Sequence, residues 1–249
     1  MSFNYKQMTC FSVILYDHSY IPKNACIMEY QVKILQINQV THDVKEFITE
    51  KPEGYSYIPG QATVVSINKP GLEQEKRPFT FTSLNEEKNL GFTIKIYPEK
   101  HGVTDSMDEL KEGDQLIIND PWGAIQYKGP GYFIAGGAGV TPFIAILRSL
   151  KKEGRVDGNM LFFSNKTRKD IILEQELLDI LGDQAIFTLT REKEPDYHYG
   201  RIDESFLKKH IQDTSKHFYV CGTPDMTEEI NQILLKLGAS SDSVVFEGK

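Results

Sequence analysis

Residues 30–127 alternate apolar and polar positions over short segments, a period near two that is typical of β-strands. Turn-forming clusters such as Pro52-Glu53-Gly54 and Pro70-Gly71 separate these segments. Six strands are expected, at residues 30–37, 44–49, 62–67, 79–84, 91–97 and 115–119, with one short helix at 104–110. Short strands at this spacing predict a small antiparallel β-barrel.

The pattern changes after Gly129-Pro130-Gly131, where strand-like runs begin to alternate with amphipathic helical stretches. The expected strands are 132–135, 160–164, 185–190, 217–221 and 244–246, and the expected helices are 142–153, 173–181, 204–211 and 224–237. This alternation predicts a five-stranded parallel sheet covered on both faces, a Rossmann-like α/β domain. We therefore expect a β-barrel domain at 28–128 and an α/β domain at 129–249. Residues 1–27 are interpreted as a disordered or peripheral N-terminal arm.

Composition narrows the class of protein. The 249 residues carry a net charge of −7, which argues against nucleic acid as the main partner. No window approaches the roughly 18 apolar residues of a membrane span. Three cysteines are too few for a disulfide framework, a four-cysteine iron–sulfur cluster or a cysteine-only zinc site. So few cysteines suggest a reducing compartment, and we expect a cytoplasmic protein. The six histidines show no metal-binding spacing, and we expect no metal.

Residues 135–142, AGGAGVTP, stand between an apolar strand and an amphipathic helix. Glycines let the backbone approach a pyrophosphate closely, and a helix N-terminus offers free N–H groups and a favourable dipole. Thr141 is expected to cap this helix, with Pro142 in its first turn. The alternative, a tight turn that needs glycine only for packing, has equal weight for an isolated motif.

A second segment, residues 77–83 (RPFTFTS), places an arginine, an aromatic ring and hydroxyl groups on one barrel strand. The planar, permanently charged guanidinium suits phosphate, and the ring suits a planar cofactor. Taken alone, the segment is more simply interpreted as a strand with inward aromatics and a surface arginine, because such residues are good strand formers.

Together and in this order, the two segments resemble the flavin motif R-x-[YF]-[ST]-x-x-S and the nicotinamide motif G-G-x-G-x-T-P of the ferredoxin–NADP reductase-like flavoprotein superfamily. Residues 221–226 (CGTPDM) resemble the family's C-G-x-P-x-M signature, and residues 101–104 (HGVT) resemble its second flavin-phosphate loop. Residues 120–123 (DPWG) resemble the turn that closes its barrel. The resemblance covers residues 28–249 and implies two cofactors, FAD and either NADPH or NADH.

The resemblance also implies roles for individual residues. Arg77 would bind the FAD pyrophosphate, Phe79 would lie against the flavin in place of the usual tyrosine, and Thr80 would hydrogen-bond near flavin N5. Cys221 would sit close to both rings during hydride transfer, and Glu247 matches a carboxylate implicated in proton supply. The implied catalytic residues are thus Thr80, Cys221 and Glu247. The implied cofactor-binding residues are Arg77, Pro78, Phe79, Thr80, Ser83, Lys95, Ile96, Gly102, Val103, Thr104, Gly137, Gly139, Val140, Thr141, Pro142, Ser164, Asn165, Arg168, Arg191, Cys221, Gly222 and Met226.

The choice between NADPH and NADH stays open. Lys166, Arg168 and Arg191 would neutralise a 2′-phosphate and so favour NADPH. Similar stretches occur in relatives that use NADH, and runs of basic residues are usually solvated surface.

We therefore expect a monomeric FAD-dependent NAD(P)H oxidoreductase that passes hydride from the nicotinamide to FAD and electrons to a separate acceptor. That acceptor is a flavodoxin, a ferredoxin, an oxygenase component or a small molecule, because the C-x₄-C-x₂-C spacing of an attached iron–sulfur module is absent. Two alternatives remain. One is a non-catalytic electron-transfer or nucleotide-sensing subunit of a larger complex, and the other is a diaphorase that reduces quinones, ferric chelates or free flavin.

Overall fold

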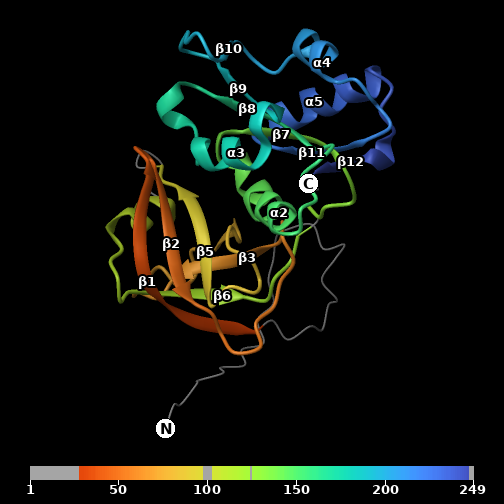
Figure 1. Cartoon of the computed structure of the whole chain (residues 1–249). Helices are drawn as coiled ribbons and strands as arrows, with labels where there is room; N and C mark the ends of the chain where they lie inside the picture. Colours follow the sequence, from red (N-terminus) through yellow and green to blue (C-terminus); the bar gives the residue numbers. More distant parts are fainter. Residues whose placement is uncertain (1–27, 98–102, 124, 247–249) are drawn as a thin grey trace.

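The computed structural model describes residues 28–97, 103–123 and 125–246. Two six-stranded sheets, each formed by one half of the chain, lie one above the other, and the longer helices gather around the second sheet (Figure 1). The expected arm at 1–27, together with Gly102 and Glu247, lies outside the described residues.

The first sheet is antiparallel and nearly closed. Its strands are β1 (Glu29–Thr41), β2 (Val44–Glu50), β3 (Ala62–Ile67), β4 (Arg77–Thr80), β5 (Asn89–Lys95) and β6 (Gln115–Asn119), in the order β4-β3-β6-β1-β2-β5. A bridge between Phe81 and Phe92 brings the two end strands together. Fully buried side chains, among them Phe47, Phe81 and Phe92, fill the interior. The expected antiparallel barrel is confirmed.

The strand expected at 79–84 is displaced, because β4 runs from Arg77 to Thr80. At Phe81 the chain leaves β3 and turns to β5, where the Thr82 N–H donates to the Gly91 carbonyl at 2.8 Å. Alternation of apolar and polar residues continues through this corner, so the pattern does not reveal it. The helix expected at 104–110 is α1 (Val103–Ser106) followed by a 3₁₀ turn at Met107–Glu109.

The second sheet is parallel throughout. Its strands are β7 (Gly131–Gly136), β8 (Met160–Asn165), β9 (Ala185–Leu189), β10 (His198–Tyr199), β11 (His217–Cys221) and β12 (Val244–Phe246), in the order β10-β9-β8-β7-β11-β12. One face is covered by α2 (Thr141–Lys152) and α3 (Glu174–Leu181), the other by α4 (Glu204–His210) and α5 (Pro224–Lys236). The parallel, doubly covered sheet is confirmed. The sheet has six strands rather than the five expected from the sequence. The additional strand, β10, has only two residues, which is too short to show a period.

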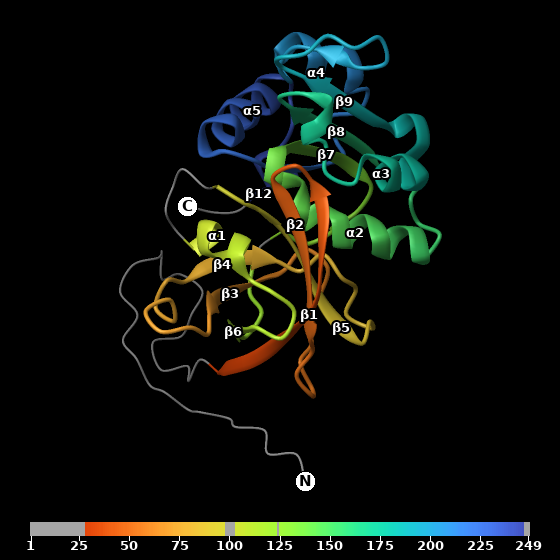
Figure 2. The ribbon, with the colours of Figure 1, turned by 90° about the vertical axis from the view of Figure 1, so that its left-hand side faces the viewer.

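Helix α2 lies at the junction of the two sheets in both views (Figures 1 and 2). Its buried side chains share a core with Val44 of β2 and Ile125 of the connection between the sheets. That connection is also fixed by the Tyr219 hydroxyl of β11. The hydroxyl accepts from the N–H groups of Lys128 and Gly129 at 2.9 and 3.0 Å and donates to the Gly129 carbonyl at 2.8 Å.

Within the described ranges, none of the helices reaches the length and hydropathy that a membrane-crossing segment requires.

Candidate functional site

Two of the sequence motifs meet where the parallel sheet reverses its order. β8 lies on one side of β7 and β11 on the other, so the crevice at the carboxyl ends of β7 and β11 is a topological switch point. Open α/β sheets usually bind their ligands at such a point. Gly136 ends β7, Cys221 ends β11, and Cys221 pairs with Ala135 in the sheet register. The structure therefore brings the AGGAGVTP and CGTPDM segments together at this crevice.

Glycine is needed at two positions here, for different reasons. A Cβ on Gly139 would lie 2.3 Å from the Cys221 carbonyl oxygen and 2.7 Å from the Gly222 nitrogen, so this turn packs directly on the backbone that ends β11. Gly137 has a φ of 53°, and its Cβ position has no described atom within 4 Å. Gly139 thus serves close packing, whereas Gly137 borders open space. Both interpretations of the glycine segment apply, each to a different residue.

Met226 packs between the other two glycines of the crevice. It lies in the first turn of α5, where its N–H donates to the Thr223 hydroxyl at 3.4 Å. A Cβ on Gly136 or Gly222 would lie 2.4 or 2.9 Å from the Met226 sulfur. The Met226 thioether therefore forms part of the wall between the ends of β7 and β11.

Helix α2 begins directly after the glycines and has no side-chain cap. Its N-cap position is Val140, so Thr141 is the first helical residue and Pro142 lies in the first turn. The expected capping role of Thr141 is wrong, because the threonine lies inside the helix rather than before it. A 3₁₀ turn at Gly137–Val140 runs directly into this helix, and the Thr141 N–H donates to the Ala138 carbonyl. The 3₁₀ turn has no side-chain cap either, so its N–H groups together with the helix dipole favour an anion at this end.

The loops after β8 and β9 are joined by their backbones. The Asn165 carbonyl accepts from the Thr190 N–H at 2.9 Å, and the Lys166 carbonyl accepts from the Arg191 N–H at 2.8 Å. Asn165 is only 5% exposed, and neither atom of its side-chain amide has a hydrogen-bond partner within the described structure. A buried amide left in this state lowers stability unless a further group binds it. Ser164, one residue earlier, lies half-buried beside Gly136 in the register of β7 and β8.

Three basic side chains on these loops differ in their surroundings. The Arg168 Nε lies 3.7 Å from Glu174 Oε2, and the backbone N–H of Arg168 donates to Glu192 Oε2 at 2.6 Å. Lys166 and Arg191 are exposed and form no ion pair with a carboxylate of the described residues. An open cleft of about 680 Å³ adjoins these loops, lined by Val40, Thr41, Thr167, Arg168, Lys169, Ile171, Glu174, Glu192 and Glu194.

On the barrel, the RPFTFTS segment divides into an outer and an inner part. Arg77 and Pro78 are exposed, Phe79 is half-buried against the barrel core, and Thr80 is 9% exposed. The Arg77 guanidinium donates to the Lys76 carbonyl at 2.7 Å and pairs with no carboxylate of the described residues. Its remaining donors are therefore available to an anion.

Ser83 belongs to the inner part of this segment. Its Oγ lies 2.7 Å from the Tyr57 hydroxyl and accepts from the Gly91 N–H at 2.8 Å. Burial raises the pKa of Tyr57 to about 12, since the hydrogen bond from Ser83 only partly offsets the loss of solvent. These contacts hold the strand corner inside the barrel.

Lys95 and Ile96, also expected at the cofactor, contact the turn between β1 and β2. The Lys95 ammonium lies 2.6 Å from Asp43 Oδ2, and the Ile96 N–H donates to the Asp43 carbonyl at 2.8 Å. Burial raises the pKa of Asp43, but the hydrogen bond and charge of Lys95 hold it below the ordinary value overall. Val103 and Thr104, the expected second phosphate contact, begin α1, with Val103 buried and Thr104 half-buried.

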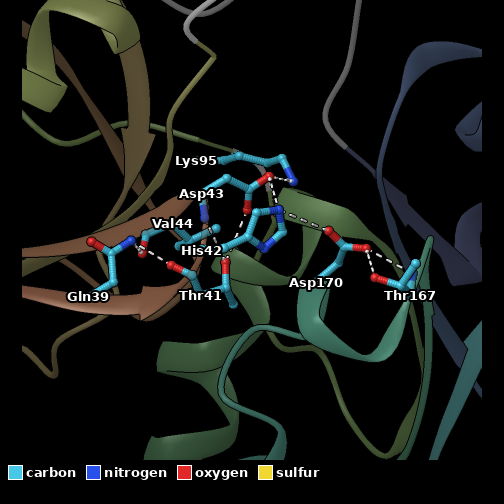
Figure 3. A network of polar contacts seen from close by, with 8 residues as sticks. All are labelled: Gln39, Thr41, His42, Asp43, Val44, Lys95, Thr167 and Asp170. Atoms are coloured by element: carbon cyan, nitrogen blue, oxygen red, sulfur yellow. Dashed lines mark hydrogen bonds and ion pairs between the residues drawn. The ribbon is translucent and has the colours of Figure 1, made fainter.

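The β1–β2 turn reaches the second sheet in a polar network that the sequence did not indicate (Figure 3). His42 Nε2 lies 3.6 Å from both Asp43 Oδ2 and Asp170 Oδ1. The other oxygen of Asp170 accepts from the N–H and hydroxyl of Thr167 at 2.8 and 2.6 Å. His42, Asp43 and Asp170 place their ligand atoms within 4.8 Å of one another. The Lys95 ammonium already neutralises Asp43, so the cluster is better explained as a contact between the two sheets.

Comparison with known proteins gives two family models that match in succession. An oxidoreductase FAD-binding domain matches residues 31–127, and an oxidoreductase NAD-binding domain matches residues 133–232.

Among curated proteins, the reductase component of propane 2-monooxygenase from Rhodococcus jostii is 23% identical over 237 residues, which cover 89% of this chain and 64% of that protein. NADH-cytochrome b5 reductase 2 from Mycosarcoma maydis is 29% identical over 253 residues, which cover 87% of this chain and 71% of that protein. The chain thus spans about two thirds of the length of these relatives.

Solved structures share the fold. A ferredoxin NADP⁺ reductase from Neisseria gonorrhoeae with bound FAD and NADP is 19% identical, with a TM-score of 0.77 over 88% of this chain and 98% of that one. The flavohem-like FAD/NAD-binding domain of nitric oxide dioxygenase from Vibrio cholerae is 20% identical, with a TM-score of 0.78 over 87% of this chain and 97% of that one.

Proposed function

The chain belongs to the ferredoxin–NADP reductase-like flavoprotein superfamily, and from this premise we propose that it is an FAD-dependent NAD(P)H reductase. It consists of an FAD-binding unit followed by a NAD-binding unit, which we assign to residues 28–128 and 129–249. One observation carries the proposal. The glycine turn packs against Cys221 and Gly222 at the switch point of the parallel sheet, and the barrel of the same chain presents Arg77 on β4.

The exposed side of β4 fits FAD. Arg77 has a guanidinium with donors left for a pyrophosphate, and Phe79 offers a half-buried ring next to it. We propose that the Thr80 hydroxyl orients the flavin at N5. Bound there, FAD supplies the ring that accepts hydride from the nicotinamide and releases electrons to the acceptor. The protein binds, orients and shields that ring from water.

The crevice between β7 and β11 fits a dinucleotide. Gly137 borders open space, the 3₁₀ turn at Gly137–Val140 that leads into α2 offers N–H groups to a diphosphate, and the orphaned Asn165 amide lies at the end of the neighbouring strand. Both atoms of that amide are buried, so we propose that a nucleotide at this strand end shifts the neighbouring loop enough to bond with them. We propose that Cys221, half-buried at the end of β11, bounds the position of the nicotinamide.

The charges on the loops after β8 and β9 favour NADPH. Dinucleotide folds place the adenosine ribose near the end of the second strand of the sheet, here β8. Lys166 and Arg191 are joined there by a backbone hydrogen bond and form no ion pair with a described carboxylate. The Arg168 Nε lies 3.7 Å from Glu174 Oε2, so the charge of Arg168 is already partly offset. We therefore assign recognition of a 2′-phosphate to Lys166 and Arg191.

A separate redox protein is the acceptor that we propose. One relative is the reductase component of a monooxygenase and another is named for cytochrome b5. The described residues contain one cysteine, Cys221, which is too few for an iron–sulfur cluster within them.

The first test is spectroscopic. The purified protein should show a flavin spectrum, and NADPH under anaerobic conditions should bleach it faster than NADH at equal, sub-saturating concentrations. A colourless protein, or a yellow one that neither nucleotide reduces, would refute the reductase activity. Fast reduction of quinones or ferric chelates together with no transfer to any redox protein would refute the proposed acceptor.

The second test separates the basic residues. Replacing Lys166 and Arg191 with Ala should raise the KM for NADPH about tenfold or more, with little change for NADH, because a charge-assisted contact contributes about 1.5–3 kcal/mol. Arg168→Ala is the matched control, since its guanidinium already has a partner. Equal changes for both coenzymes, or a larger NADPH-specific effect of Arg168→Ala, would contradict the assignment.

A further inference from the structure

Arg148 links the helix that follows the glycine turn to the strand segment that carries the flavin motif. It lies on α2, about two turns after Thr141. Its Nη1 donates to the Thr82 carbonyl of the barrel at 2.7 Å. Thr82 is two residues after Thr80, so one hydrogen bond connects the nucleotide unit to the RPFTFTS segment.

A carboxylate fixes the orientation of this guanidinium. Arg148 Nε and Nη2 donate to the two oxygens of Glu176 on α3, at 2.6 and 2.8 Å. Such a bidentate pair defines the plane of the guanidinium and therefore the direction of Nη1. The two side chains are 23% and 33% exposed, which leaves them less open to competing water than surface ion pairs.

The acceptor on the barrel is equally constrained. Thr82 is fully buried, its N–H donates to the Gly91 carbonyl at 2.8 Å, and its hydroxyl accepts from that of Thr93 at 3.2 Å. The Thr82 carbonyl is thus a fixed point of the barrel beside the corner at Phe81. Arg148 joins this point to a helix whose first turn borders the dinucleotide crevice.

We propose that Arg148 is a positioning residue for hydride transfer, one that sets the distance between the two half-sites by holding α2 against the Thr82 carbonyl. The proposal rests on the reductase function proposed above. Hydride transfer requires the donor and acceptor atoms to be about 3–3.5 Å apart, and an error of 1 Å lowers the rate about 100-fold. An interdomain bond this close to both motifs acts on that distance without touching either ring.

The test compares Arg148→Met with Lys152→Met. Lys152 lies four residues later on α2 and pairs with Glu86 of the barrel, but the two side chains are 59% and 52% exposed. It is therefore a matched interdomain charge of little expected energy. Flavin reduction by saturating NADPH is followed by stopped flow, and hydrogen–deuterium exchange is measured on residues 82–84 and 141–152 with and without cofactors.

Arg148→Met should lower the reduction rate constant about 10- to 100-fold, with nucleotide affinity changed less than about threefold, and should speed exchange in both segments. Arg148→Lys should recover part of the rate, because it keeps a charged donor but loses the fork. Lys152→Met should match the wild type in both measurements. A double variant, Arg148→Met with Glu176→Met, also removes the carboxylate that Arg148→Met leaves without a partner. Its flavin reduction should stay slow, because the hydrogen bond to Thr82 is still missing.

Wild-type rate and exchange in Arg148→Met would overturn the proposal, as would full recovery in the double variant or an equal loss in Lys152→Met. If neither nucleotide reduces the wild-type flavin, the proposed function fails. The exchange comparison still decides whether Arg148 holds the two units together, and unchanged exchange then overturns that role as well.

Discussion

Gly139→Ala is the substitution with the sharpest quantitative expectation. The new Cβ would lie 2.3 Å from the Cys221 carbonyl oxygen, 2.5 Å from its carbonyl carbon and 2.7 Å from the Gly222 nitrogen. Ordinary contacts begin near 3.4 Å, so the turn and the end of β11 must separate by about 1 Å. Both partners are backbone, and no change of rotamer relieves the overlap. Overpacking of this kind costs about 1–3 kcal/mol of folding stability.

The displacement should affect the reaction more than the fold. A separation of about 1 Å at the switch point predicts a roughly 100-fold slower flavin reduction at saturating nucleotide, measured by stopped flow. Thermal unfolding followed by circular dichroism should show a Tm lower by about 2–12 °C, since each kcal/mol shifts the Tm of a chain this long by about 2–4 °C.

Gly137→Ala is the matched control, because it changes the same turn without a collision. Its φ of 53° costs an alanine about 1–2 kcal/mol, and its Cβ would meet no described atom within 4 Å. This variant should raise the KM for the nucleotide yet keep most of the rate at saturation. Flavin reduction at the wild-type rate in Gly139→Ala, or an equal loss of rate at saturation in both variants, would show that the separation at the switch point does not set the rate.

Three further outcomes are expected. Arg77→Met should weaken FAD retention about tenfold or more in equilibrium dialysis. Lys76→Met should not, because the Lys76 ammonium already pairs with Glu29 at 2.7 Å. Equal retention by the two variants would contradict the phosphate-binding role of Arg77. Asn165→Leu should stabilise the nucleotide-free protein by about 1 kcal/mol in urea unfolding and weaken nucleotide binding, and unchanged binding would contradict the assignment of its amide. Burial raises the pKa of Tyr57 to about 12, so its contribution to stability is present below pH 10 and is lost as the pH rises towards 12. Tyr57→Phe should make that part of the stability–pH curve less steep, and an unchanged slope would contradict this contribution of Tyr57.

Local periodicity predicted most of the fold because each element buries one face against a partner. The alternation in β1 to β6 and the strand–helix alternation after Gly131 both reflect that constraint. The corner at Phe81 was not visible, since alternation persists while the chain changes its pairing partner from β3 to β5. The two-residue strand β10 was missed because its pairing depends on β9 and not on its own sequence.

The candidate site was predictable only where its chemistry is contiguous in the chain. Residues 136–142 and 221–226 carry recognisable spacing, and the sheet register places them together. Arg148 and His42 stand in segments without a motif, and their partners lie more than 60 residues away, at Thr82 and Asp170. No local pattern encodes such pairs. The ion pair of Lys95 with Asp43, 52 residues earlier in the chain, is another contact that no local pattern encodes.

Hydrogen bonds hold the connection between the two sheets in place, and this constrains how electrons can leave the protein. One hydroxyl, that of Tyr219, holds both Lys128 and Gly129, and the units it joins share a core. A domain that swings to carry electrons needs a connection free to rotate, and this one is held by three hydrogen bonds. The two units therefore keep their relative orientation while the separate acceptor proposed above approaches them. Turnover should therefore rise with acceptor concentration until chemistry limits it, with no plateau set by the rotation of one unit against the other.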